Sequence, residues 1–144
     1  MGCSAARGGA RYRPAIATWD DVRRLALALP EAREDERRGQ RRWRVRDRLF
    51  VWERPLRAAD ERALGPSAPD GPILGARVEH LGAREALLAG PPGGPYFTIP
   101  HFDGYAAILV RLEEIAPDEL EELVVEAWLA VAPKRLVRAH LEGR

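Results

Sequence analysis

Arginine is the residue whose type and spacing in this sequence most clearly predict a chemical role. Residues 37–48 contain seven Arg and one Asp. Arg42, Arg44 and Arg46 alternate with apolar residues, the pattern of a half-buried strand, so their side chains are expected to share one face at intervals of about 6.8 Å. This spacing approaches that of phosphates along a nucleic-acid strand, and a guanidinium can bind a phosphate bidentately. The alternative is a solvated strand face whose charges keep an exposed edge from pairing.

A second polar group, His101, Asp103 and Tyr105, occupies alternate positions of one short segment. If these side chains converge, they form a polar pocket or the tip of a hairpin. The alternative is a turn in which His101 and Asp103 bond to nearby backbone groups. No candidate nucleophile neighbours the histidine, so acid–base catalysis has little to act on.

The sequence lacks the parts of most catalytic and metal sites. Cys3 is the only cysteine, which excludes an intrachain disulfide and a thiolate zinc site. Neither serine lies in a Gly-x-Ser-x-Gly turn, the histidines have no His-Glu-x-x-His spacing, and no glycine-rich loop carries a lysine. The acidic residues of 113–126 fit the first turn and solvated face of a helix, without an oxygen-ligand loop. We therefore expect a non-enzymatic protein without a metal or cofactor.

The net charge of +1 conceals a strong separation of charges along the chain. Residues 1–62 hold 16 basic and 10 acidic residues, residues 63–132 hold 3 and 11, and residues 133–144 hold 4 and 1. Lys134 and Arg135 in the last segment are either a second phosphate contact or helix-terminal surface charges. The chain has no Asn and a single Gln, so bidentate adenine readout is almost unavailable and any nucleic-acid binding should be largely independent of sequence.

The 144 residues fit one domain, predicted over 16–144, after a disordered tail at 1–15. No apolar run approaches the roughly 20 residues that span a bilayer, and the start lacks a secretory signal, so we expect a cytoplasmic protein without membrane contact.

Apolar periodicity predicts an α+β fold of the order α-β-β-β-α-β-β-α-α, a five-stranded, largely antiparallel sheet with helices packed on one face. The expected helices cover 18–29, 83–89, 117–132 and 135–141, and the expected strands lie within 41–53, 73–78, 96–99 and 107–112. The segment 54–72 is expected to be an extended loop that is mobile or holds a short helix near Asp60–Leu64.

Two motifs resemble the MmcQ/YjbR family. The segment Tyr96-Phe97-Thr98-Ile99-Pro100-His101-Phe102-Asp103-Gly104-Tyr105 is similar to the family's Phe-x-x-Pro-His-x-x-Gly-Tyr, and Ala132-Pro133-Lys134-Arg135-Leu136 is similar to its closing segment. The resemblance covers about residues 18–141 and implies a CyaY-like fold. It also implies DNA binding through two hairpin wings, here 43–52 and 96–112. The sequence departs from the family at Pro91–Pro95 and has Arg48 where a hairpin lysine is common.

These observations predict a small nucleic-acid-binding protein, for duplex DNA with little sequence preference. The expected phosphate contacts are Arg41, Arg42, Arg44, Arg46 and Arg48, with Lys134 and Arg135 as secondary candidates. One alternative is a protein–protein interaction module that uses the 54–72 loop and the acidic helix face. A weaker alternative is a small-molecule pocket beside His101 and Tyr105. The DNA prediction requires that the hairpin guanidiniums stand in water without carboxylate partners.

Overall fold

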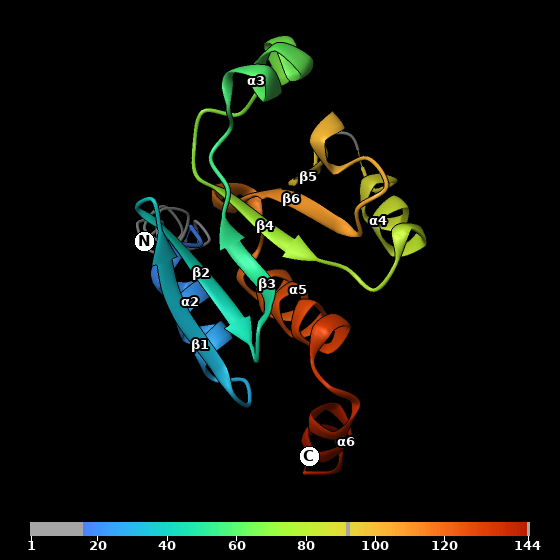
Figure 1. Ribbon diagram of the computed structural model, residues 1–144. Helices are drawn as coiled ribbons and strands as arrows, with labels where there is room; N and C mark the ends of the chain where they lie inside the picture. The colour runs from blue at the N-terminus through green and yellow to red at the C-terminus, as the bar shows by residue number, and fades with distance from the viewer. Residues whose placement is uncertain (1–15, 92, 144) are drawn as a thin grey trace, which may run out of the picture.

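In the computed structural model, which describes residues 16–91 and 93–143, six strands form one antiparallel sheet in the order β1-β2-β3-β4-β6-β5. The tail expected at 1–15 lies outside the described residues. The strands are β1 (Ala32–Arg37), β2 (Gln40–Val45), β3 (Arg48–Glu53), β4 (Ile73–Arg77), β5 (Tyr96–Phe97) and β6 (Ala107–Arg111). The helices are α2 (Trp19–Leu27), α3 (Ala58–Leu64), α4 (Leu81–Leu88), α5 (Pro117–Val131) and α6 (Lys134–Glu142), with 3₁₀ turns at Gly65–Ser67, Pro100–Phe102 (η2) and Leu112–Glu114. The α+β class is thus confirmed, with six strands rather than five (Figure 1).

The additional strand is β1, which lies at the edge of the sheet beside β2 (Figure 1). Its sequence, Ala-Arg-Glu-Asp-Glu-Arg, has no large apolar residue, so it carries no period-two hydrophobic signal. Its pairing with β2 instead places Asp35 opposite Arg42 and Glu36 opposite Arg41. Opposite charges at paired positions stabilise a sheet, and a charged edge discourages pairing with other chains.

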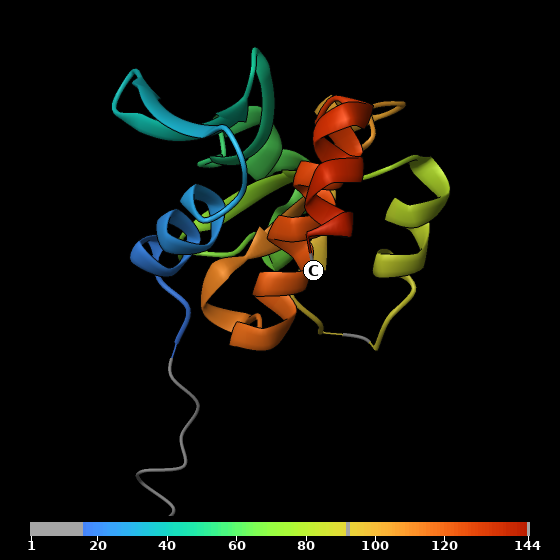
Figure 2. The same ribbon diagram turned by 90° about the horizontal axis from the view of Figure 1, so that it is seen from below.

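Helices α2 and α5 cover one face of the sheet and enclose the main hydrophobic core (Figures 1 and 2). Helix α2 begins after Thr18, whose hydroxyl accepts a hydrogen bond from the Asp21 backbone N–H while the Asp21 carboxylate accepts one from the Thr18 N–H. This reciprocal cap satisfies two backbone donors at the helix start. The apolar stripe predicted for the long helix is buried, with Leu120, Leu123, Val124, Ala127, Trp128 and Val131 facing the core.

A second, smaller core lies on the opposite face of the sheet, under α3 and η2. It contains Trp52, Ile73, Phe97, Ile99, Phe102, Ala107 and Leu109. Gly75 of β4 makes room for it, because a Cβ at this position would lie 2.4 Å from Cε2 of the Trp52 indole. The expectation that all helices pack on one face is therefore wrong for α3, the short helix that forms within the 54–72 loop.

Candidate nucleic-acid interface

The arginines of the β2–β3 hairpin do not form the predicted row of three. Arg42 and Arg44 share the sheet face that points away from α2 and α5, as their spacing predicted. Arg41 points to the other face, where its guanidinium carbon lies 5.8 Å from the centre of the Trp19 ring of α2. Arg46 lies beyond the end of β2, in the turn, with a φ of 56°. The row is thus reduced to a pair.

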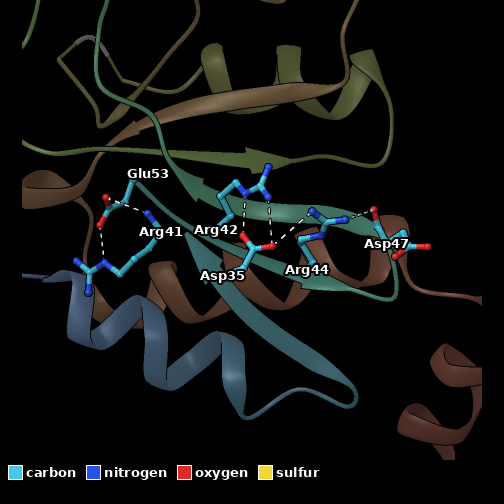
Figure 3. Close-up of polar contacts among 6 residues, drawn as sticks. All are labelled: Asp35, Arg41, Arg42, Arg44, Asp47 and Glu53. Atoms are coloured by element: carbon cyan, nitrogen blue, oxygen red, sulfur yellow. Dashed lines mark hydrogen bonds and ion pairs between the residues drawn. The ribbon is translucent and has the colours of Figure 1, made fainter. Parts of the chain in front are cut away.

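Carboxylates neutralise the strand arginines (Figure 3). The guanidinium of Arg42 donates from Nε and Nη2 to the two Asp35 oxygens, at 2.8 and 3.2 Å. Nη1 of Arg44 lies 3.5 Å from the same carboxylate, and Nε of Arg41 donates to Glu53 at 2.7 Å. The hydrogen bond from Arg42 holds the pKa of Asp35 below its ordinary value, so the carboxylate stays charged at neutral pH.

The remaining predicted contacts gather at the other end of the hairpin, where the β2–β3 turn approaches α6 (Figure 1). Nε of Arg46 donates to Glu31 at 2.5 Å. This hydrogen bond lowers the pKa of Glu31, and the nearby charge of Arg135 makes a smaller contribution in the same direction. Lys134 and Arg48 are exposed and form no ion pair within 16–91 and 93–143. The requirement that the hairpin guanidiniums stand free of carboxylates is therefore met only by Arg48.

A different basic surface lies on the face that carries Arg42. A cavity of about 680 Å³ opens between the tip of the β1–β2 hairpin, the segment after β3 and the η2 turn. We call this surface the basic concavity. Its basic side chains are Arg37, Arg38, Arg42, Arg54 and Arg57, and the rest of its lining is Gln40, Leu49, Trp52, Glu53, His101, Phe102 and Tyr105. Folding thus brings arginines from two separate segments against aromatic residues from the second half of the chain.

Arg54 is the buried member of this group, with 6% of its surface exposed. Its Nη1 donates to the Pro55 carbonyl at 2.6 Å and lies 3.1 Å from the Asp60 carboxylate of α3. Burial acts to raise the pKa of Asp60, but the N–H of Arg57 and the charge of Arg54 together keep it below its ordinary value. Nη2 of Arg54 is buried and has no hydrogen-bond partner among the described residues. An unpaired buried donor is costly, so this guanidinium keeps an unused capacity for an acceptor.

The aromatic wall of the concavity is held in place by two further arginines. Nη1 of Arg84, a buried residue of α4, donates to the carbonyls of Phe102 and Tyr105 at 2.7 and 3.0 Å. Nε of Arg77 donates to the Ala106 carbonyl at 3.1 Å, and its guanidinium carbon lies 5.0 Å from the centre of the Tyr105 ring. These contacts fix the loop from η2 to β6, which includes the Gly104 backbone at a φ of 75°.

Only part of the predicted polar pocket comes together. His101 and Tyr105 both line the concavity, whereas Asp103 is exposed and does not. The Phe102 ring packs near both, with its centre 6.0 Å from that of His101 and 5.6 Å from that of Tyr105. Within the described residues, no group of three His, Cys, Asp or Glu side chains is placed to hold a metal ion.

Sequence reasoning missed Arg37, Arg38, Arg54, Arg57 and Arg84 as site residues. The first two belong to the basic run at 37–48, so their composition signal was present, but they lie outside its alternating part. Arg54 and Arg57 lie in a segment that the sequence predicts to be a loop. No local sequence pattern indicates that this segment will lie beside a face of the sheet. Arg84 resembles an ordinary helix-surface arginine until the fold places it beneath the η2 loop.

A model of the YjbR family matches residues 27–130. The chain belongs to the YjbR family. It is 52% identical over 129 residues to proteins of Mycobacterium bovis and of two Mycobacterium tuberculosis strains, covering 88% of this chain and 97% of each relative. These relatives are described as uncharacterised proteins, so the match establishes the family and identifies no ligand. Among the described residues, no helix has the length and apolar character needed to cross a membrane.

Proposed function

We propose that this protein is a non-enzymatic nucleic-acid-binding protein and that the basic concavity contacts the phosphates. The observation that carries the proposal is the convergence of five arginines around one cavity beside aromatic side chains. Arginine binds phosphate bidentately, and exposed rings offer stacking surfaces for bases. Of the predicted row, only Arg42 lines the concavity, and Arg44 and Arg46 lie outside the proposed interface.

Three arginines of the concavity are available to a ligand. Arg37, Arg38 and Arg57 are exposed and form no ion pair with any described residue. The single acidic residue of the lining, Glu53, is bound by Arg41 of the neighbouring strand β2. The surface is thus strongly positive although the whole chain has a net charge of only +1.

The shape of the concavity favours a single strand over a duplex and over a small molecule. The cavity is open to solvent, whereas small-molecule sites bury most of their ligand. His101 is exposed and Tyr105 is 40% exposed, and stacking on such rings requires bases that are not paired within a duplex. A continuous duplex groove would need Lys134 and Arg135 on the same surface, and neither lines the concavity. We therefore expect single strands to bind more tightly than the duplex that the sequence pattern suggested.

The test is fluorescence anisotropy of a labelled mixed-sequence oligonucleotide, as a single strand and as a duplex, over a series of salt concentrations. The variant Arg37→Gln/Arg38→Gln/Arg57→Gln should weaken single-strand binding by about tenfold or more at low salt. It should also flatten the slope of log K against log salt by up to about 2, since each lost contact to a single strand removes about 0.7.

A matched control removes the same charge at the other end of the molecule, through Arg46→Gln/Lys134→Gln/Arg135→Gln. This variant should bind the single strand nearly as wild type does. Equal losses in the two variants would indicate attraction by net charge alone and contradict the assigned surface. A wild-type protein that binds neither oligonucleotide at low salt would contradict the function itself.

A further inference from the structure

An acidic groove with an apolar floor lies between α4 and α5, away from the basic concavity. Its volume is about 350 Å³. Val78, Ala83, Leu87, Tyr96 and Leu123 contribute apolar surface, and Ala86 lies at its exposed side. Figure 2 shows α4 standing apart from α5, so the groove has a helix on each side. A groove lined by apolar side chains within a charged rim is typical of a site for a peptide segment.

The rim is acidic, and its glutamates from α5 form no ion pair within the described residues. Glu119, Glu122 and Glu126 follow one another along a single face of α5, since their spacing of three and four residues matches the helical repeat. Glu79 faces them from the end of β4. None of the four carboxylates lies within ion-pair distance of a described Lys or Arg.

Two internal contacts involve the polar residues of the groove and leave the glutamates of α5 without a described Lys or Arg partner. The Tyr96 hydroxyl donates to Glu119 at 2.6 Å, and burial together with this carboxylate raises the pKa of Tyr96, so the hydroxyl keeps its proton. The guanidinium of Arg77, the basic residue of the lining, is turned toward the Ala106 carbonyl and the Tyr105 ring. The three glutamates of α5 thus have no Lys or Arg partner among the described residues, whereas Glu79 lies 3.8 Å from Nε2 of His80.

We infer that this groove binds a peptide segment of a partner protein that presents apolar side chains flanked by Lys or Arg. The apolar floor would receive the hydrophobic side chains, and the glutamates of α5 would pair with the cations beside them. A bare metal ion does not fit, because the carboxylates are spread along two turns of helix rather than gathered around one point. The groove and the concavity lie on opposite faces of the sheet, so both can be occupied at once.

The test uses three labelled synthetic peptides of about 14 residues, or four helical turns. One contains Leu and Lys arranged with one apolar face, the second has the same composition without that face, and the third contains Lys and Ser only. Anisotropy should show the first peptide binding most tightly. The variant Glu122→Gln/Glu126→Gln should weaken its binding by about threefold to tenfold, the range for two partly exposed ion pairs.

A second variant, Ala86→Arg, places a long cationic side chain into the groove from an exposed position and should abolish the preference for the first peptide. The matched control, Glu113→Gln/Glu114→Gln, removes the same charge from exposed positions outside the groove and should bind as wild type does. Equal affinity for all three peptides, or unchanged affinity in Ala86→Arg, would overturn the inference. Oligonucleotide binding measured on the same variants should stay unchanged, which separates this result from the fate of the nucleic-acid proposal.

Discussion

The Gly75→Ala substitution tests the packing that shapes the aromatic floor of the concavity. The added Cβ would lie 2.4 Å from Cε2 of the Trp52 indole and 2.7 Å from Cζ2 and Nε1. Ordinary contacts of a Cβ are about 3.4 Å or longer, so the ring or the strand must move by about 1 Å. The indole cannot withdraw freely, because it is 92% buried and its ring centre lies 6.4 Å from that of Phe102.

Overpacking of this kind costs about 1–3 kcal/mol. For a chain of this length, we therefore expect Gly75→Ala to lower Tm by about 3–10 °C, measured by differential scanning calorimetry. Gly90→Ala is the matched control, because its added methyl group meets only the Leu87 carbonyl, at 3.4 Å. The control should change stability by less than about 0.5 kcal/mol. If Gly75→Ala were as stable as Gly90→Ala, the close packing of Trp52 on β4 would be wrong.

Three further predictions concern the charged groups. Asp35→Asn frees the two strand arginines, so single-strand binding should tighten and its salt slope should steepen by up to about 1.4; unchanged binding would show that these guanidiniums take no part. Arg84→Met removes the two charge-assisted hydrogen bonds to the Phe102 and Tyr105 carbonyls, so it should destabilise the protein by about 2–3 kcal/mol and speed amide exchange at Tyr105, whereas exchange at the wild-type rate would contradict the proposed role of Arg84 in fixing this loop. The lowered pKa of Asp60 means that its contribution to stability is present above the ordinary value of 3.8 and is lost as pH falls through the lower folded value. Urea unfolding between pH 5 and about pH 2 should therefore be less pH-dependent in Asp60→Asn, and an unaltered profile would refute this role.

Most of the fold could be predicted because its elements carry strong local signals. The apolar stripe of α5, the proline at its start and the alternation in β2 each have a direct physical cause in the chain. β1 could not be predicted in this way, since its six residues are charged or small. It forms because β2 offers an edge and because Asp35 forms ion pairs with Arg42 and Arg44 across the strands.

The candidate site could be predicted less well, because ion pairing depends on tertiary neighbours. The sequence shows that Arg42 and Arg44 share a strand face, and the structure confirms this. The sequence does not show that Asp35 will lie beside both arginines, because this contact requires strand β1, which has no hydrophobic pattern by which it could be predicted. Similarly, Arg54 and Arg57 line the concavity in an arrangement that depends on α3, since Asp60 of this helix pairs with the Arg54 guanidinium and accepts a hydrogen bond from the Arg57 N–H.

Mapping the bound oligonucleotide on the protein tests the central claim most directly. In a titration of ¹⁵N-labelled protein with a short single strand at low salt, the largest amide shifts should fall on Gly39, Arg57 and the segment 101–105, around the concavity. Amides of the β2–β3 turn and of α6 should move little. Shifts that centre on Asp47 and Arg135 instead, with the concavity unaffected, would contradict the assignment.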